Sequence, residues 1–292
     1  MRIGVAILPD SAWSQLRPRW LEAEQRGFTT AWTYDHLSWR SLRDGPWLGT
    51  VPLLGAVVEA TTTLRVGTLV TSPNFRHPAL LAKDVMTLDQ VSGGRVDLGV
   101  GAGGTGYDAS VLGADPLSPQ DRAARFEEFV DVLDALLRDQ SASHSGRFYA
   151  VHESRTYPGC VQQPRVPFTV AGAGPRAMRV AAAHAHTWVT YGPVRGHEGL
   201  DDWFAAVEVQ VGRLREACEA VGRDPASIRR MALAGLESRW QQSSVAAWDD
   251  FCARLETLGF TDVVLHWPRP EDPELPGPPV SVFDEISTRL RP

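Results

Sequence analysis

Short apolar runs alternate along the chain with longer segments in which apolar residues recur at every third or fourth position. The first run is Arg2–Leu8, and Leu16, Trp20 and Ala23 follow it at helical spacing before Gly27 provides a helix stop. The same alternation recurs along most of the chain. Strands that alternate with helices predict a parallel sheet whose crossovers are helical.

Eight strands are predicted, and each is followed by a helix-like segment. The strands are Arg2–Leu8, Thr29–Thr33, Leu64–Val70, Arg95–Val100, Phe168–Ala171, Thr187–Tyr191, Ile228–Gly235 and Thr261–His266. The later helices are expected at Val51–Ala60, at Pro78–Val91, from Ser118 through Leu137, from Gly172 to about His184, at Leu200–Ala220, at Val245–Leu258 and from Ser281 onward. Eight strand–helix units predict an α/β fold of the (β/α)8, or TIM, barrel type.

The alternation is interrupted between residues 140 and 167. Turn-forming pairs such as Pro158-Gly159 and Gln163-Pro164 stand there in place of a regular element. We therefore expect an insertion near residues 140–167 within the barrel. No repeat or low-complexity linker divides the chain, and barrels of this length occur as one unit, so residues 1–292 are expected to form a single domain.

Composition narrows the classes of function. The chain has 292 residues, 43% of them hydrophobic, and a net charge of −6, which is ample for a folded core. No lysine- or arginine-rich run points to nucleic acid, and no apolar run approaches the roughly 18 residues that span a bilayer. The short apolar start is not expected to be a signal peptide, so a cytoplasmic protein is predicted.

Two residue counts argue against particular chemistries. Cys160, Cys218 and Cys252 are widely separated, which disfavours a disulfide framework or a metal site. The sole lysine, Lys83, falls in the middle of a predicted helix, and arginine cannot form a Schiff base. Mechanisms that depend on pyridoxal phosphate or a Schiff base are therefore disfavoured.

Chemically useful residues follow several predicted strands. In parallel α/β folds, ligands bind beyond the carboxyl ends of the strands. Asp35 and His36 close the second strand as a candidate acid/base or hydrogen-bonding pair, although a capping Asp35 and a packed His36 are the structural alternative. Arg76 follows the third strand and can donate to a carbonyl or phosphate, unless it forms a surface salt bridge.

Two glycine-rich turns are candidate ligand cradles. The first, Gly101-Ala102-Gly103-Gly104-Thr105-Gly106, matches the dinucleotide-binding spacing, but the acids about 20 residues later lie in a predicted helix, which argues against a Rossmann domain. Its glycines still allow a planar ligand or a phosphate to approach the backbone, or they form only a tight turn. The second, Gly172-Ala173-Gly174-Pro175-Arg176, starts a helix and favours an anion, or it serves only as a cap.

Histidine and tryptophan supply further alternatives. His184 and His186 form a His-x-His pair, but the pair precedes the sixth strand at its amino end. A metal-dependent barrel hydrolase, the alternative from another class, would need these two together with His36 and His266 as ligands. Trp39 and Trp47 in the loop after the second strand are candidate walls for an aromatic ligand or core residues.

Taken together, these motifs resemble the luciferase-like monooxygenase family, barrel enzymes that use flavin or the deazaflavin coenzyme F420. The resemblance extends over nearly the whole chain, and the Leu-Asp-x-x-Ser-x-Gly-Arg run is its most specific part. It rests on Tyr34-Asp35-His36, Arg76-His77-Pro78-Ala79, Leu88–Arg95, Leu98–Gly103, Arg125-Phe126-Glu127-Glu128, Gly146–Tyr149, Gly172–Arg176 and Gly222-Arg223-Asp224-Pro225.

The resemblance implies how a cofactor would be held. Its ring would lie over the barrel mouth, with His36 hydrogen-bonding near it and a bulge at Leu69-Val70, often with a non-prolyl cis peptide in the family, behind it. The loop Gly101–Gly104 and the helix start Gly172–Gly174, with Arg176 adding charge, would hold the ribityl and phosphate portions. The sugar-phosphate dehydrogenases of the family carry a glutamate where Gly104 stands here, so that substrate class is in doubt.

The function implied is hydride transfer between F420 and a small organic substrate, with no metal. His36 would be the hydrogen-bond partner or proton donor, and Asp35 would orient it. The alternative within the class is a two-component monooxygenase that uses reduced FMN, with a separate reductase and a water-poor pocket. A non-catalytic flavin-binding homologue is a third reading, and a homodimer is expected from the family. The residues expected to line the substrate pocket are Trp39, Trp47, Trp188, Tyr191, His266 and Trp267.

Overall fold

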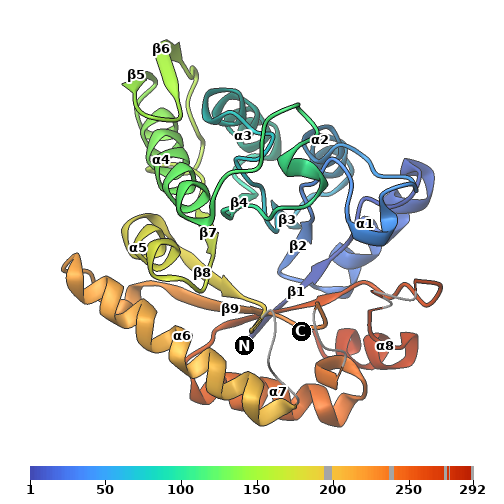
Figure 1. Cartoon of the computed structure of the whole chain (residues 1–292). Helices are drawn as coiled ribbons and strands as arrows, with labels where there is room; N and C mark the ends of the chain where they lie inside the picture. The colour runs from blue at the N-terminus through green and yellow to red at the C-terminus, as the bar shows by residue number, and fades with distance from the viewer. Residues whose placement is uncertain (194–198, 237–239, 273–274, 276, 291–292) are drawn as a thin grey trace.

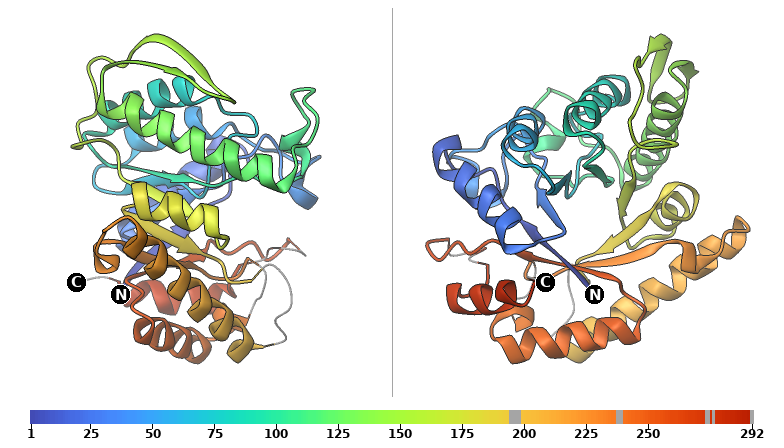
Figure 2. Two further views of the ribbon diagram at one scale, coloured as in Figure 1. Left: turned by 60° about the vertical axis from the view of Figure 1, so that its left-hand side comes forward. Right: turned by 180° about the vertical axis from the view of Figure 1, so that it is seen from behind.

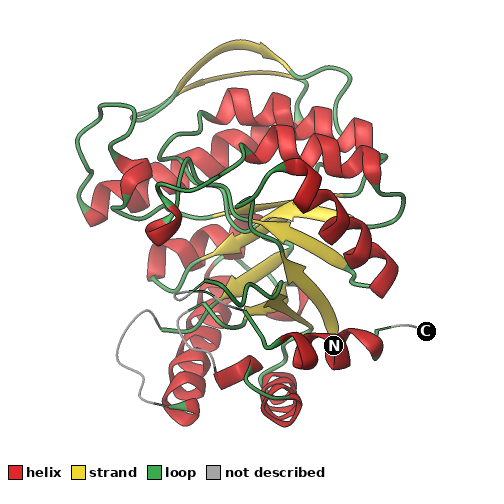
Figure 3. Cartoon of the chain, turned by 90° about the vertical axis from the view of Figure 1, so that its right-hand side faces the viewer, coloured by secondary structure: helices red, strands yellow, loops and turns green. Residues whose placement is uncertain are grey.

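In the computed structural model, which describes residues 1–193, 199–236, 240–272, 275 and 277–290, eight parallel strands close into a barrel. Figure 1 shows the strands at the centre with helices arranged around them, and Figure 3 shows the same relation from the side. The order around the barrel is β1-β10-β9-β8-β7-β4-β3-β2. The predicted TIM barrel is therefore confirmed.

Each element lies close to its predicted place. The barrel strands are β1 (Arg2–Ala6), β2 (Thr30–Thr33), β3 (Arg65–Thr68), β4 (Val96–Val100), β7 (Phe168–Ala171), β8 (Thr187–Thr190), β9 (Arg229–Leu233) and β10 (Asp262–His266). The helices are α1 (Trp13–Arg26), α2 (Thr50–Ala60), α3 (Pro78–Ser92), α4 (Pro119–Arg138), α5 (Pro175–His184), α6 (Leu200–Ala220), α7 (Val245–Thr257) and α8 (Val280–Thr288). Short 3₁₀ turns are η1 (Arg40–Leu42), η2 (Tyr107–Ala109), η3 (Pro225–Ser227) and η4 (Trp240–Gln242).

Two predicted helix ends show why the boundaries could be anticipated. Gly27 closes α1 in the left-handed conformation, with φ 88°, which glycine adopts without a steric cost. Ser118 begins α4 by accepting a hydrogen bond from the backbone N–H of Asp121, and Pro119 occupies the first turn.

The predicted insertion is a two-stranded hairpin, β5 (Ser141–Ser145) and β6 (Ala150–Arg155), followed by a loop. It projects beyond α4 at the edge of the barrel (Figures 1 and 2). Glu128 of α4 holds its turn by accepting from the backbone N–H groups of Phe148 and Tyr149 at 3.0 and 2.8 Å. These bonds keep the pKa of Glu128 below its ordinary value despite partial burial, which opposes them.

Side chains of the barrel strands separate into two buried clusters. The outer cluster fills the layer between strands and helices, and the inner cluster fills the barrel itself. The inner cluster consists of Ala6, Leu8, Trp32, Tyr34, Leu69, Val189, Met231, Leu233, Val264 and Leu275. Because successive strand residues point to opposite faces, this division decides which predicted site residues can face the barrel mouth. Among the described residues, no helix is both long and apolar enough to span a membrane.

Candidate active site

The carboxyl ends of β2, β3 and β4 bring a histidine, an arginine and a run of glycines to one end of the barrel. On β2, Ala31 belongs to the outer cluster, whereas Trp32 and Tyr34 belong to the inner one. His36 comes two residues after Tyr34, so its side chain points to the same side, and the two ring centroids lie 6.3 Å apart. The side chain of His36 is 30% exposed, so its imidazole is accessible at the barrel mouth.

A carboxylate that the sequence reasoning did not single out contacts His36. Nδ1 of His36 lies 2.5 Å from Oδ2 of Asp108, and the backbone N–H of Leu37 donates to Oδ1 of the same carboxylate at 2.9 Å. Asp108 is buried and lies in η2, beyond the first glycine-rich turn. The pairing joins residues 72 positions apart through an irregular segment, so no local pattern could reveal it.

Asp35 does not orient His36, which corrects the sequence-based expectation. Its carboxylate is 1% exposed and accepts hydrogen bonds from Nη2 and Nε of Arg76 at 2.7 and 3.0 Å, and from the hydroxyl of Thr71 at 2.5 Å. Successive residues of an extended chain point to opposite sides, so Asp35 and His36 diverge. Arg76, which was expected to contact a ligand, directs two of its nitrogens to the buried carboxylate of Asp35, while its own side chain stays 21% exposed.

Below the mouth, Tyr34 and His266 form a buried pair. Nδ1 of His266 lies 2.9 Å from the carbonyl oxygen of Ala234, and Nε2 lies 2.8 Å from the hydroxyl of Tyr34. Since a carbonyl only accepts, Nδ1 carries the proton and the tyrosine hydroxyl donates to Nε2. Burial lowers the pKa of His266 to about 4. His266 is therefore a neutral residue buried inside the barrel. It lies below the mouth, whereas it was expected to line the substrate pocket at the mouth.

Two of the predicted pocket tryptophans lie beside the candidate histidine. The rings of Trp39 and Trp47 are stacked, with centroids 6.4 Å apart and planes at 25°. Trp47 donates from Nε1 to the backbone carbonyl of His36 at 2.7 Å, and Trp39 packs edge-on against Tyr34 at 5.3 Å. Both tryptophans and Tyr191 are partly buried and pack on the inner cluster. These three residues are placed where they can line the mouth.

The other two predicted pocket tryptophans are not at the mouth. Trp188 is fully buried in the outer cluster, where it contacts Phe260 and donates from Nε1 to the carbonyl of Gly172 at 2.8 Å. Trp267 packs against Phe283 of α8, with ring centroids 4.9 Å apart. Both side chains belong to the outer cluster and point toward the helices, so the structure gives no support to their expected place in the substrate pocket.

The peptide bond between Leu69 and Val70 is cis, at the position where the family resemblance placed such a bond. Leu69 belongs to the inner cluster, and Val70 packs against it. A Cβ built on Gly101 would lie 2.7 Å from Cγ2 of Val70, so only glycine fits there. Leu69, Val70 and Gly101 thus form one close-packed floor at the ends of β3 and β4.

The first glycine-rich turn is tied to its neighbours by side chains. Gly103 has φ 73°, and the carbonyl of Gly104 accepts from Asn74 at 3.1 Å. Asn74 in turn accepts from Nη2 of Arg125 at 2.5 Å, while the buried Nε of Arg125 has no partner among the described residues. Ala102 packs against the outer cluster. Arg125 is thus a second residue that the sequence reasoning did not choose as a site residue.

The second glycine-rich turn joins β7 to α5. A Cβ on Gly172 would lie 2.2 Å from Cβ of Ala177, which makes glycine obligatory at the turn. Ala173 and Gly174 are exposed, nothing lies within 4 Å of a Cβ on Gly174, and Gly174 is the N-cap of α5. Arg176 donates weakly to the carbonyl of Gln120 at 3.3 Å. The turn therefore presents accessible backbone at a helix N-terminus, as expected.

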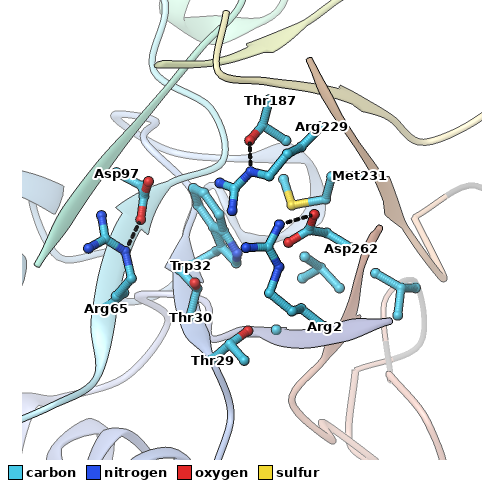
Figure 4. Close-up of a pocket in the computed structure, with 13 residues that line it drawn as sticks. Arg2, Thr29, Thr30, Trp32, Arg65, Asp97, Thr187, Arg229, Met231 and Asp262 are labelled. Carbon is cyan, nitrogen blue, oxygen red and sulfur yellow. Dashed lines mark hydrogen bonds and ion pairs between the residues drawn. The ribbon is translucent and has the colours of Figure 1, made fainter. Parts of the chain in front are cut away.

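At the opposite, amino-terminal end, the barrel encloses a cavity of about 70 Å³ (Figure 4). Figure 4 shows Trp32 between the ion pairs Arg65–Asp97 and Arg2–Asp262, whose closest atoms are 2.7 and 2.8 Å apart. Burial raises the pKa of Asp97, although Arg65 opposes that effect. The cavity is lined by charges that largely pair with each other, and it lies away from His36. We assign it to the structural closure of the barrel rather than to the candidate site.

The histidines considered as metal ligands do not converge. Nε2 of His184 lies 2.7 Å from Asp131 in the helix layer, whereas His36 and His266 face the barrel mouth and interior. Arginines and burial lower the pKa of His186 to about 4, with burial the largest cause. Among the described residues, no group of three or more potential ligands could hold a metal ion.

Comparison with known sequences connects this geometry to a family. The sequence model of a family described as luciferase-like monooxygenase matches residues 1–273. An F420-dependent glucose-6-phosphate dehydrogenase of Beutenbergia cavernae is 35% identical over 54% of this chain and 47% of its own length. A 4-hydroxyprotoasukamycin monooxygenase of Streptomyces nodosus subsp. asukaensis is 29% identical over 82% of this chain and 66% of its own. The alignment to the first of these relatives spans about half of that protein's length.

Solved structures with the same fold are more distant in sequence. The coenzyme F420 dependent tetrahydromethanopterin reductase from Methanopyrus kandleri superposes with a TM-score of 0.73 at 18% identity, covering 98% of this chain and 97% of its own. An F420-dependent secondary alcohol dehydrogenase in complex with an F420-acetone adduct gives a TM-score of 0.70 at 21% identity, covering 99% and 81%. At these identities the comparison establishes the fold alone.

Proposed function

We propose that this chain, which belongs to the luciferase-like monooxygenase family, is an oxidoreductase. It would transfer a hydride between coenzyme F420 and a small organic substrate. The observation that carries the proposal is the accessible imidazole of His36, placed at the barrel mouth with its Nδ1 fixed by Asp108. Relatives named as F420-dependent dehydrogenases support the choice of F420.

The residues present fit such a cofactor. Gly174 and Gly104 are exposed and have no heavy atom closer than 3.9 Å to a built Cβ, so backbone N–H groups there are open to an anionic tail. Arg125, whose buried Nε has no partner in the part of the chain that the structure describes, and the guanidinium of Arg176 would add donors for phosphate oxygens. The deazaflavin would supply a carbon that accepts or donates a hydride, while the protein supplies position and electrostatics.

The protein's own residues would handle the proton and exclude water. His36 is the group at the mouth that can take up or deliver a proton at Nε2. Trp39, Trp47 and Tyr34 surround it with aromatic surface, and the floor of Leu69 and Val70 closes the mouth from below. Asp35 and Arg76 would act indirectly, by fixing the backbone at the ends of β2 and β3.

A second candidate function is a monooxygenase that uses reduced FMN and oxygen. The stacked pair Trp39–Trp47 favours it to the extent that an oxygen adduct needs a dry pocket, and one relative bears the name of a monooxygenase. This function would require a separate reductase. Homodimerisation, expected from the family, stays a prediction under either function.

The deciding experiment is a titration of the purified protein with F420 and with FMN, each oxidised and reduced, followed by cofactor or tryptophan fluorescence. We expect tight binding of F420 that weakens in Gly174→Asp, because a carboxylate at the α5 N-cap repels an anion while remaining a good helix cap. Gly212→Asp, at an open position within α6, is the matched control and should bind normally. Preference for reduced FMN would support the oxygenase, and binding of neither cofactor would refute both.

A further inference from the structure

Each oxygen of the Asp108 carboxylate has a hydrogen-bond partner among the described residues. Oδ2 faces Nδ1 of His36 at 2.5 Å, and Oδ1 accepts from the backbone N–H of Leu37 at 2.9 Å. The side chain of Asp108 is 6% exposed, whereas that of His36 is 30% exposed. A buried carboxylate therefore contacts the Nδ1 edge of an imidazole that is itself partly exposed.

This geometry determines which imidazole nitrogen carries the proton. An ionised carboxylate only accepts hydrogen bonds, so Nδ1 of His36 must donate to Asp108. In the neutral ring, Nε2 then holds a lone pair, and among the described residues it has no hydrogen-bond partner. The site is thus prepared to remove a proton from a bound molecule.

We propose that Asp108 is the positioning residue of His36 and that it fixes the tautomer in which Nε2 accepts the hydroxyl proton of an alcohol substrate. This inference rests on the proposed function, because F420 serves as the hydride acceptor. The O–H bond breaks and its proton passes to Nε2, while the O–H electron pair forms the carbonyl. The neighbouring C–H bond breaks, and its electron pair leaves as hydride to oxidised F420. The resulting imidazolium is balanced by the carboxylate of Asp108.

Asp108 also joins the two segments that flank the mouth. It is part of η2, and through Leu37 it is bonded to the loop that carries Trp39 and Trp47. Arg43 of that loop lies over the ring of Tyr107, 4.6 Å from its centroid, which adds a second link between the same segments. The orientation of the base therefore depends on both segments being in place.

The substitution Asp108→Asn gives a sharp test. The backbone N–H of Leu37 donates to this side chain and needs an acceptor, so the asparagine amide must turn its oxygen toward Leu37. The amide NH₂ would then face Nδ1, which would have to become the acceptor, and the proton would move to Nε2. The variant keeps the size and contacts of the side chain but reverses the tautomer of His36.

The first readout is ¹⁵N NMR of protein labelled at histidine, with the His36 signals assigned by their loss in His36→Gln. We expect protonated Nδ1 and unprotonated Nε2 in the wild type, and the reverse in Asp108→Asn. Asp115→Asn, an exposed aspartate of the same connecting segment, is the control and should leave the His36 signals unchanged. Protonated Nε2 in the neutral wild-type ring, or an unchanged tautomer in Asp108→Asn, would overturn the proposal.

The second readout is turnover of oxidised F420 with a panel of small secondary alcohols. We expect kcat of Asp108→Asn to fall on the order of 100-fold with KM nearly unchanged, and F420 binding to stay normal by fluorescence. Partial recovery in Asp108→Glu would agree with a carboxylate requirement. Failure of the wild type to bind F420 would refute the proposed function and this alcohol chemistry together, whereas normal F420 binding with equal kcat in Asp108→Asn would refute this inference alone.

Discussion

His184 is expected to make the stability of the fold depend on pH. Its Nε2 lies 2.7 Å from Asp131, and its Nδ1 lies 3.7 Å from Asp134, which also binds Arg165 and Arg138. Burial alone would lower the pKa of His184, but the two carboxylates outweigh it and raise the pKa to about 9 from 6.5.

The sign and size of the effect follow from linkage. Because the folded-state pKa of His184 lies above the unfolded value, its contribution is fully present below pH 6.5 and is lost as the pH rises through 9. A shift from 6.5 to about 9 corresponds to about 3 kcal/mol at pH 6.5 and under about 0.5 kcal/mol at pH 9. Asp131 is 56% exposed, and solvent screens such pairs, so we expect about half of this difference, roughly 1–2 kcal/mol.

The assay is denaturant unfolding of the wild type and His184→Gln at pH 6.5 and at pH 9. The glutamine keeps a polar side chain but cannot become charged, so the gap between the two proteins should shrink by roughly 1–2 kcal/mol on going to pH 9. His186→Gln is the control: its histidine has a pKa lowered to about 4 and is neutral in the folded protein across the range. Since only its unfolded form is protonated at pH 6.5, its gap to the wild type should change by no more than about 0.4 kcal/mol, and in the opposite direction. A gap between wild type and His184→Gln that stays constant across the range would refute the reasoning.

Three further changes test other parts of the structure. Asp35→Asn should lower the free energy of unfolding by about 2–3 kcal/mol, less than for a fully buried pair, because it leaves the partly exposed cation of Arg76 without its buried partner; an effect below about 1 kcal/mol in denaturant unfolding would contradict this role of the pair. Gly172→Val should prevent normal folding, since even its Cβ would overlap α5, whereas Gly174→Ala, with open space around it, should change stability by under about 0.5 kcal/mol, as thermal unfolding can show. Trp188→Phe should cost about 1–2 kcal/mol through its lost bond to Gly172 and should leave KM for the substrate unchanged in steady-state kinetics; a large rise in KM would return Trp188 to the substrate pocket.

The fold could be predicted because the local signals agree with one another. The stop at Gly27, the cap at Ser118 and the glycines between elements each mark a boundary that depends on a few neighbouring residues. Eight apolar runs between helices then leave few topologies besides a closed parallel barrel. The insertion was visible for the same reason, as a stretch in which turn residues replaced the periodic pattern.

The site was harder to predict because it depends on direction and on distant contacts. Strands buried on both faces are apolar throughout, so the run Thr187–Thr190 does not reveal that Trp188 points outward while Val189 points inward. His36 could be chosen from its place at a strand end, but its partner Asp108 lies in an irregular segment. Asp35 is adjacent to His36 in sequence, which suggests a pair, but adjacency along an extended chain places side chains on opposite sides.

The pairing of the first strand, β1, with the last, β10, closes the barrel and has a consequence for biosynthesis. β1 and β10 pair in register from Arg2–Asp262 to Ala6–His266, and Arg2 also binds Asp262 through its side chain across 260 positions. During translation, β1 therefore cannot pair with β10 until nearly the whole barrel has been synthesised. Until then the growing chain is an open sheet with β1 at an unprotected edge, the kind of intermediate that chaperones bind and that aggregates when crowded.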